Sequence, residues 1–216
     1  MSKKSPRYIP ALSFGWLTPL YDPILKWAMR EETFKQRLVQ GANLQPNMDV
    51  LDLGCGTGTL TVMLKQAAPL ANITGVDGDP QVLSIAQSKA IQANLNIRWD
   101  KCMAFDLPYP DNSFDIVTSS LVIHHLTAPD KLRAFQEVRR VLRPGGCFLI
   151  VDFGPPYSLL TRIQSAVMKN LEEAADNFAG HIPPLLQKAG FRAQIEAQMN
   201  TIFGPLAFYA AQNYGG

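Results

Sequence analysis

A glycine-rich segment, VLDLGCGTGTL (Val50 to Leu60), is the feature that most constrains the fold of this chain. It lies between a predicted buried strand, Met48 to Gly54, and a predicted helix, Thr57 to Ala68, both indicated by the spacing of apolar residues. Its glycines are Gly54, Gly56 and Gly58. Because glycine has no side chain, the backbone of such a loop can approach a ligand closely. The segment therefore predicts a βα unit with a ligand at the carboxyl end of its strand.

Strands and helices alternate on both sides of this unit. Further strands are predicted at Asn72 to Asp77, Asn96 to Trp99, Phe114 to Ser120 and Gly146 to Phe153, and further helices at Asp22 to Gly41, at Pro80 to Ala93 and around the buried stripe Leu132, Phe135, Val138 and Leu142. The last helix is expected to end at Pro144-Gly145-Gly146, because glycine favours helix ends. The alternation predicts an α/β fold with a doubly wound, mostly parallel sheet covered on both faces.

The C-terminal part of the chain has a different pattern. FRAQIEAQMN and FGPLAFYAAQ predict two strands with little between them, hence an antiparallel pair that brings the sheet to seven strands. No repeat or linker divides the 216 residues, so we expect a single domain, 1–216. Its expected parts are an N-terminal helical cap (1–45), a ligand-binding core (46–153), a helical lid or substrate segment (154–190) and the C-terminal strand pair (191–216).

Composition limits the classes of function. With 47% apolar residues, 18% charged residues and a formal net charge of +2, the chain lacks the basic excess that would suggest a nucleic acid partner. The three cysteines are far apart without C-x-x-C spacing, so we expect neither a disulfide framework nor a metal site, and a cytoplasmic location. No segment approaches the roughly 18 apolar residues of a membrane span.

The N-terminal stretch YIPALSFGWLTPLY, Tyr8 to Tyr21, is unusually apolar for a chain terminus. Prolines interrupt it, so it does not resemble an export signal. Three interpretations stay open: it packs on the domain, it lines an apolar pocket, or it makes a peripheral contact with a membrane surface.

The residues around the glycines decide among three ligands. A phosphate-binding P-loop needs a lysine after its last glycine, whereas Thr59 and Leu60 follow Gly58. A dinucleotide loop has a third glycine where this chain has Thr59. Asp52, at the end of the strand, would repel a pyrophosphate by about 1 to 4 kcal/mol at 4 Å and would attract an ammonium group.

A ligand that combines an amino-acid head, a sulfonium and a nucleoside satisfies this preference, and S-adenosylmethionine is the common cofactor with those parts. Asp77, at the end of the second strand, is placed to accept hydrogen bonds from ribose hydroxyls. The alternative is that Asp52 caps the following turn and Asp77 caps the helix that begins at Pro80.

Four motifs extend the pattern: VLDLGCGTG (50–58), GVDGDP (75–80), LPYPDNSFDIVTSSLVIHHL (107–126) and VLRPGGCFLIVDF (141–153). With these the sequence resembles the class I S-adenosylmethionine-dependent methyltransferases, and within them the subgroup related to the ubiquinone and menaquinone biosynthesis C-methyltransferases. The resemblance runs from about Tyr21 to the C-terminus and implies a Rossmann-like fold. It is specific for fold and cofactor, and it does not identify the methyl acceptor.

The resemblance implies which residues bind the cofactor: Tyr21, Asp52, Gly54, Cys55, Gly56, Gly58, Asp77, Gly78, Met103, Ala104, Ser119 and Ser120. The methionine head is expected against Asp52 and the serines, and the ribose against Asp77. Met103-Ala104 stands where the family usually has an Asp-Ala pair that contacts adenine. Asp100 and Asp106 are both candidates to replace that missing carboxylate.

Methyl transfer needs a base only if the acceptor must lose a proton. His124 and His125 are the candidate catalytic residues, because histidine titrates near neutral pH. Other candidates are Asp152, Tyr21 and Tyr157, and one histidine of the pair could merely begin a helix. We expect methyl transfer from S-adenosylmethionine to a small, aromatic or lipophilic acceptor; the alternative is a cofactor-binding protein without catalysis.

Overall fold

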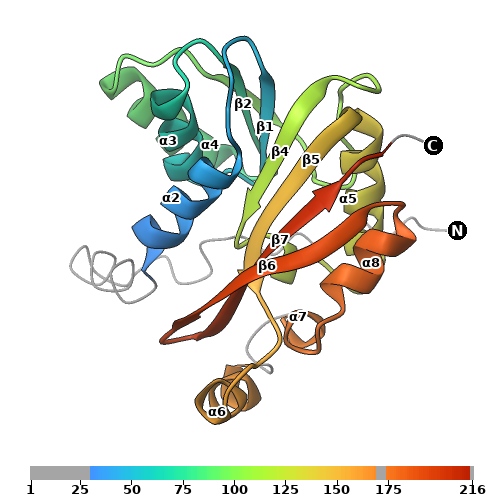
Figure 1. Cartoon of the computed structure of the whole chain (residues 1–216). Coiled ribbons are helices and arrows are strands. Elements are labelled where there is room, and N and C mark those ends of the chain that lie inside the picture. Colours follow the sequence, from blue (N-terminus) through green and yellow to red (C-terminus); the bar gives the residue numbers. More distant parts are fainter. Residues whose placement is uncertain (1–29, 169–173, 215–216) are drawn as a thin grey trace, which may run out of the picture.

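In a computed structural model, which describes residues 30–168 and 174–214, the chain forms one mixed sheet with helices on both faces (Figure 1). The strands are β1 (Asp49–Leu53), β2 (Asn72–Asp77), β3 (Arg98–Lys101), β4 (Phe114–Ser120), β5 (Leu142–Phe153), β6 (Arg192–Thr201) and β7 (Gly204–Gln212). The helices are α2 (Glu31–Gly41), α3 (Thr59–Ala67), α4 (Pro80–Gln92), the 3-10 turn η1 (Ile123–His125), α5 (Ala128–Val141), α6 (Leu159–Met168), α7 (Ala175–Phe178) and α8 (Ile182–Lys188).

The sheet has seven strands in the order β3-β2-β1-β4-β5-β7-β6. The strands from β3 to β5 are parallel, whereas β7 is antiparallel to both β5 and β6. The predicted α/β class, the doubly wound sheet and the C-terminal antiparallel pair are therefore confirmed. Because β1 and β4 are neighbours at the sheet centre, where the strand order reverses, their carboxyl ends border the crevice in which sheets of this kind bind ligands.

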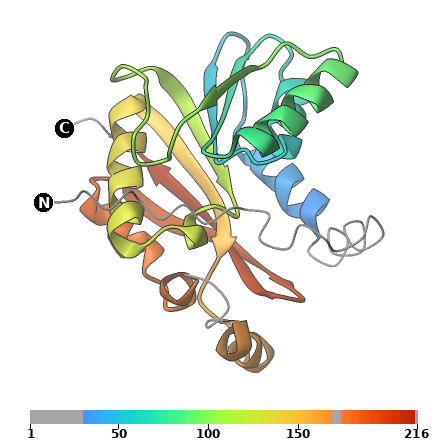
Figure 2. The ribbon, with the colours of Figure 1, turned by 180° about the vertical axis from the view of Figure 1, so that it is seen from behind.

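Two apolar clusters hold helices on the two faces of the sheet (Figures 1 and 2). One cluster joins α2 and α3 to the sheet, with members that include Phe34, Leu38, Leu60, Leu64 and Val151. The other joins α5 and α8 to the opposite face, with members that include Phe135, Val138, Ile182, Leu186 and Ile150. Since Val151 and Ile150 are adjacent on β5 and point to opposite faces, the central strands are buried on both sides, as a parallel sheet requires.

Local signals explain where α4 and α5 begin. Asp79 is the N-cap of α4, and its carboxylate accepts a hydrogen bond from the Gln81 amide at 2.8 Å. Thr127 caps α5 in the same way through the Asp130 amide. The capping role considered for Asp77 therefore belongs to Asp79, two residues further along the chain.

The predicted end of the helix with the stripe Leu132 to Leu142, at Pro144-Gly145-Gly146, is wrong. Helix α5 ends at Val141, and β5 begins at once with Leu142, which pairs with Phe114 of β4. The glycines lie inside an irregular start of the strand, where Gly145 has φ 84° and the register between β4 and β5 shifts. Asn213 stabilises this irregular segment, because its side-chain amide donates to the Leu142 carbonyl at 2.9 Å.

Smaller differences concern the edges. Strand β3 runs from Arg98 to Lys101, two residues later than expected, because Thr74 to Asp77 of β2 pair with those residues. The segment expected to be helical before the C-terminal pair forms three separate helices, α6 to α8, over its described residues. Three subjects of prediction lie outside the described residues: Tyr21, the apolar N-terminal stretch, and the start of the helix that was expected at Asp22. Among the helices of residues 30–168 and 174–214, none is long and apolar enough to cross a membrane.

Gly75 and Gly41 provide a matched test of the packing. A Cβ at Gly75 of β2 would lie 2.5 Å from the Trp99 ring, whereas a Cβ at Gly41 in the last turn of α2 would meet nothing within 4 Å. We expect Gly75→Ala to reduce the free energy of unfolding by about 1 to 3 kcal/mol through overpacking. Gly41→Ala is expected to increase that free energy by about 0.5 to 1 kcal/mol through helix propensity. Urea unfolding of both variants measures the difference, and equal effects would contradict this description of the β2–β3 contact.

Candidate functional site

The glycine loop is a tight turn held by the neighbouring strand. Gly54, Gly56 and Gly58 all have positive φ angles, from 52° to 75°. The Cys55 amide donates to the Val76 carbonyl at 2.8 Å, and the Gly56 amide donates to the Asp77 carboxylate at 2.9 Å. A side chain at Gly56 would meet no atom within 4 Å, so the loop borders open space on that side.

The glycine loop also touches the segment that carries the histidines. A Cβ at Gly54 would lie 2.5 Å from the Val122 side chain, so only glycine permits this contact between the β1 loop and the turn after β4. Leu121, which precedes that turn, has φ 56°, a conformation that is costly for a residue other than glycine and is often found at functional sites. Its amide donates to the Val151 carbonyl at 2.9 Å. The contact brings η1 beside the glycine loop.

Asp52 is buried under the loop, with 1% of its surface exposed. One carboxylate oxygen accepts from the Thr61 hydroxyl at 2.6 Å and the other from the Thr118 hydroxyl at 3.0 Å. Burial raises the pKa of the Asp52 carboxyl above its ordinary value, although the two hydroxyl donors oppose that rise. Sequence reasoning missed both threonines, which come from α3 and β4 and become neighbours of Asp52 only in the fold.

Asp77 joins the loop to the next part of the site. Besides the Gly56 amide, its carboxylate accepts from the Asp79 amide at 2.9 Å. Burial raises the pKa of Asp77. Each oxygen of an ionised carboxylate can accept more than one hydrogen bond, so these two contacts leave acceptor capacity for hydroxyl groups such as those of a ribose. Gly78 follows directly on the chain and is partly exposed.

Met103 and Ala104 lie beside Asp77, because the Cys102 amide donates to the Asp77 carbonyl at 3.2 Å. Of the two candidate replacements for the missing carboxylate, Asp100 is already engaged. It pairs with Arg98 at 2.7 Å and accepts from the Tyr109 hydroxyl at 2.7 Å. Asp106 is exposed, and a short backbone bridge links it to Met103, so both carboxylates stay candidates for this role.

Ser119 and Ser120 end β4 next to the glycine loop. Ser119 is fully buried, and its hydroxyl oxygen has no hydrogen-bond partner within the described part of the chain. The same end of the sheet therefore carries the glycine loop, the carboxylates of Asp52 and Asp77, and the Ser119 hydroxyl, which has no partner among the described residues. These groups fit a ligand with an ammonium head and ribose hydroxyls.

His124 and Asp152 form the best-defined polar pair of the site. The His124 Nδ1 atom lies 2.8 Å from Asp152 Oδ1, and the two side chains are 6% and 0% exposed. Asp152 also accepts from the backbone amides of Val122, Ile123 and Phe153 at 2.7 to 3.1 Å. Burial alone would raise the pKa of Asp152, but His124 and these hydrogen bonds outweigh burial and hold that pKa below its ordinary value.

An ionised Asp152 can only accept hydrogen bonds, so the proton shared with His124 belongs to Nδ1. Nε2 is then the nitrogen that can take up a proton. The ring of His125 lies 4.0 Å from that of His124, and His125 is less buried. Tyr157, another candidate base, is 50% exposed at the start of α6. Of the candidate bases, Asp152 is the one whose carboxylate is fully buried and already bonded to His124 and to backbone amides.

Two further contacts were not expected from the sequence. Lys89 of α4 donates to the hydroxyls of Thr57 and Thr59, at 2.9 and 3.1 Å, and so fixes the end of the glycine loop. Asn177 of α7 donates to Asp152 at 3.0 Å and accepts from the buried Lys131 at 2.9 Å. Lys131 shares the buried face of α5 with Phe135 and Val138, so helical periodicity is the signal that could have identified it.

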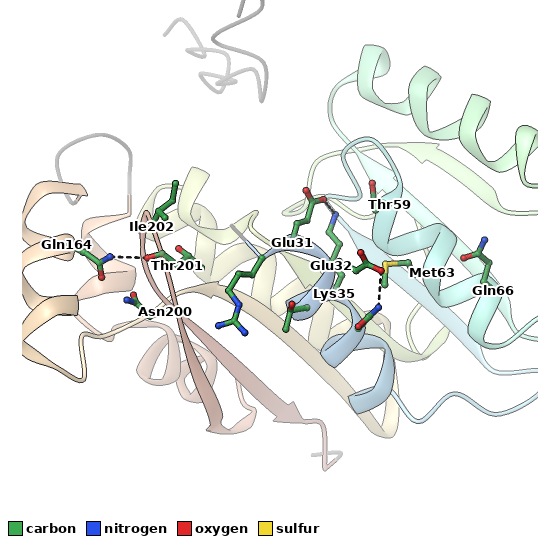
Figure 3. A pocket seen from close by; sticks show the side chains of 13 residues that line it. Glu31, Glu32, Lys35, Thr59, Met63, Gln66, Gln164, Asn200, Thr201 and Ile202 are labelled. Carbon is green, nitrogen blue, oxygen red and sulfur yellow. Dashed lines mark hydrogen bonds and ion pairs between the residues drawn. The ribbon is translucent and has the colours of Figure 1, made fainter. Parts of the chain in front are cut away.

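A cleft of about 1200 Å³ lies between α2, α3, α6 and the β6–β7 turn (Figure 3), and none of the described residues expected to bind the cofactor or to act in catalysis lines it. Thr59 and Met63 of α3 and the Glu31–Lys35 pair of α2 line one side. The opposite side is made by α6 and the β6–β7 turn, with Gln164, Asn200, Thr201 and Ile202. Gln164 donates to the Thr201 carbonyl at 3.0 Å and so joins these two elements into one wall.

The fold and the groups at its carboxyl edge define a class I, Rossmann-like methyltransferase. Residues 50–146 match the family model described as a methyltransferase domain. A methyltransferase of Synechocystis is 34% identical over 164 residues, and the match covers 74% of each chain. The chain belongs to the class I S-adenosylmethionine-dependent methyltransferase family, and its cofactor is S-adenosylmethionine.

Within that family the chain is similar to quinone-biosynthesis enzymes. A demethylmenaquinone methyltransferase of Thermus thermophilus is 35% identical over 145 residues, which are 66% of this chain and 65% of that protein. The match therefore spans slightly less than two thirds of that relative. Among solved structures, the YcgJ protein of Bacillus subtilis aligns with a TM-score of 0.69 and 19% identity over 84% of this chain and 98% of that one, a likeness of fold alone.

The variant Asp52→Asn tests whether the Asp52 carboxylate serves cofactor binding or only the stability of the fold. Because burial raises the native pKa of Asp52 above 3.8, the native state binds more protons than the unfolded state, and its stability falls as pH rises toward the native pKa. Burial of this carboxyl group therefore costs stability at every pH above its ordinary pKa of 3.8, and we expect Asp52→Asn to raise the Tm of the unliganded protein at neutral pH. We expect the same variant to weaken cofactor binding about tenfold, because an ammonium head loses its counter-charge.

Thermal unfolding and calorimetry with S-adenosylmethionine measure the two effects of Asp52→Asn. The matched control is Asp115→Asn, because Asp115 pairs with Arg143 at 2.7 Å at the other end of the sheet. This control should leave cofactor affinity unchanged. A lower Tm together with unaltered affinity in Asp52→Asn would mean that the carboxylate is only structural.

Proposed function

We propose that this protein transfers the methyl group of S-adenosylmethionine to a small, lipophilic aromatic acceptor of the quinol or phenol type, with His124 as the base. The observation that carries the proposal is the His124–Asp152 pair, which the Gly54–Val122 contact holds beside the cofactor loop. The names of the quinone-biosynthesis relatives support the acceptor class.

The chain's own residues supply orientation and a proton acceptor. When bound, S-adenosylmethionine supplies an electrophilic methyl group and leaves as S-adenosylhomocysteine. His124 takes the acceptor's hydroxyl proton at Nε2 while Nδ1 stays bonded to Asp152, and the electron pair released on the acceptor forms the new bond to the methyl carbon. The ionised Asp152 stabilises the imidazolium that results. Alignment of two reactants in one site contributes up to about 7 to 11 kcal/mol, and a positioned base contributes about 10² to 10⁴-fold in rate.

Exposed apolar side chains of α6 beside the cleft support a lipophilic acceptor, whereas most residues that line the cleft itself are polar. Helix α6, which forms part of the cleft wall, turns Leu159, Leu160, Ile163 and Val167 outward, each at least 58% exposed. Its buried residues include Thr161 and Ser165 instead, which reverses the usual arrangement of a surface helix. An apolar surface of this kind commonly marks an interaction site.

Two expectations remain proposals. The apolar stretch Tyr8 to Tyr21 would contribute to acceptor binding or make a peripheral membrane contact, and unchanged activity after deletion of residues 2–20 would contradict the acceptor role. We place the protein in the cytoplasm, an assignment supported by three free cysteines, Cys55, Cys102 and Cys147.

Transfer of a radiolabelled methyl group tests the proposed activity. We expect the wild-type protein to label a member of a panel of quinols, phenols, amines and lipids, with a quinol or phenol as the best acceptor. His124→Asn should lower kcat by about 10²-fold or more, because a general base is lost. Calorimetry should show nearly unchanged cofactor affinity in that variant.

Three outcomes would contradict parts of this proposal. If the protein binds the cofactor tightly and labels nothing, it is a cofactor-binding protein without catalysis. If His125→Asn abolishes transfer and His124→Asn does not, the base is His125 and not His124. A preference for amines would exclude the acceptor class.

Met63→Trp tests whether the acceptor enters the described cleft. Met63 lines the cleft on α3, so a larger side chain should occupy space that the acceptor needs. We expect the KM for the acceptor to rise about tenfold and the Kd for the cofactor to stay constant. Leu70→Trp is the control, because Leu70 is 68% exposed and lines no described pocket. Equal KM values in both variants would place the acceptor elsewhere.

A further inference from the structure

One side chain of helix α7, Asn177, contacts the proposed catalytic pair His124–Asp152. Asn177 is fully buried, and its amide nitrogen donates to Asp152 Oδ1 at 3.0 Å, the same oxygen that His124 contacts. Its amide oxygen accepts from the ammonium group of Lys131 at 2.9 Å, and Lys131 is also fully buried. A four-residue chain of contacts thus runs from α5 through α7 and β5 to η1.

The order of donors along this chain fixes the orientation of the amide. Lysine can only donate, so the Asn177 oxygen must face Lys131, and the nitrogen must then face Asp152. The ring of Phe178, the next residue, packs 5.2 Å from that of Phe153, the residue after Asp152. Helix α7 is therefore anchored to the end of β5 at two adjacent positions, one polar and one aromatic.

We propose that Asn177 is a positioning residue through which the segment between β5 and β6 sets the orientation and basicity of His124. This inference rests on the proposed function, because it takes His124 as the base. Asn177 stabilises the negative charge on the oxygen that His124 contacts. As a result, Asp152 stabilises the protonated form of the His124 imidazole less strongly. Lys131 keeps Asn177 in the orientation that allows this.

Other charged and titratable groups face the same network from each packed element. Asp176 of α7 lies 3.9 Å from the Lys131 ammonium, and the His125 ring lies 4.0 Å from the His124 ring. Burial, and to a smaller extent the charge of Asp152, raise the pKa of Tyr209 of β7. None of these groups is in the set of hydrogen bonds described for Asp152. Within the described residues, His124 and Asn177 are therefore the two side chains with a defined hydrogen bond to Asp152.

Two variants test the proposal. Asn177→Leu has a similar volume and removes both hydrogen bonds, whereas Asn177→Asp keeps an acceptor for Lys131, removes the donor to Asp152 and adds a second carboxylate beside it. In both we expect the acidic limb of the kcat profile to move to higher pH, because Asp152 then stabilises the imidazolium more strongly. The shift should be about half to one pH unit in Asn177→Leu, the size of one ordinary hydrogen bond, and larger in Asn177→Asp, because the added carboxylate also stabilises the imidazolium.

A second measurement does not depend on activity. The chain has three histidines, so NMR of protein labelled with ¹⁵N-histidine gives a simple spectrum, in which His124→Asn identifies the His124 signals. The midpoint of the His124 titration should move upward by the same amount as the kcat limb. Cofactor affinity should stay constant. His181→Asn is the control, since His181 belongs to the same segment, is 58% exposed and contacts Asp176 rather than Asp152.

The outcomes separate this inference from the proposed function. If both variants fold and neither the His124 titration nor the kcat limb moves, Asn177 has only a structural role and the inference is overturned, even when His124→Asn abolishes transfer. If His124→Asn retains full activity, the proposed base is wrong whatever Asn177 does. Should Asn177→Leu fail to fold, Asn177→Ala replaces it, because it also removes both hydrogen bonds and adds no charge beside Asp152.

Discussion

The buried carboxylate of Asp152 is the constraint on which the catalytic end of this molecule depends. It sits at the end of β5 and accepts hydrogen bonds from the turn after β4, from its own neighbour Phe153 and from α7. A buried charge is stable only when its hydrogen-bonding capacity is satisfied, so these contacts require β5, η1 and α7 to stay together. His124 is oriented as a consequence of this requirement, because it supplies one of the donors that Asp152 needs.

Two further carboxylates give the same edge of the sheet its negative character, and their environments differ. Asp52 is fully enclosed and bonded to two hydroxyls, whereas Asp77 is partly exposed and bonded to backbone amides of the loop and of the helix start. Loops that bind phosphate present amide groups without such charges. This arrangement suits a cationic head beside Asp52 and neutral hydroxyls beside Asp77, which is the charge pattern of S-adenosylmethionine.

The sequence predicted the sheet because its signals are local. Alternating apolar runs placed β2 and β4 at their observed ends, and the glycines placed the loop between β1 and α3. The boundary between α5 and β5 failed because Pro144-Gly145-Gly146 resembles a helix end, whereas the actual boundary depends on pairing with Phe114 and on Asn213, which is far away in the sequence. Local chemistry does not reveal a partner that arrives from the C-terminus.

The residues of the candidate site differ in the same way: some carry a local sequence signal, and others depend on contacts that only the fold creates. His124 could be selected from its residue type and its place after a strand, and Asp152 from its place at the end of the next strand. The geometry on which the proposed role of His124 rests could not be predicted, because it depends on the burial of Asp152 and on its contact with the His124 Nδ1 atom. Asn177 carries no signal of its own, since an asparagine in a polar segment is ordinary. Lys131 does carry one: a lysine on the apolar face of a helix loses its hydration, so its position requires a polar partner from another element.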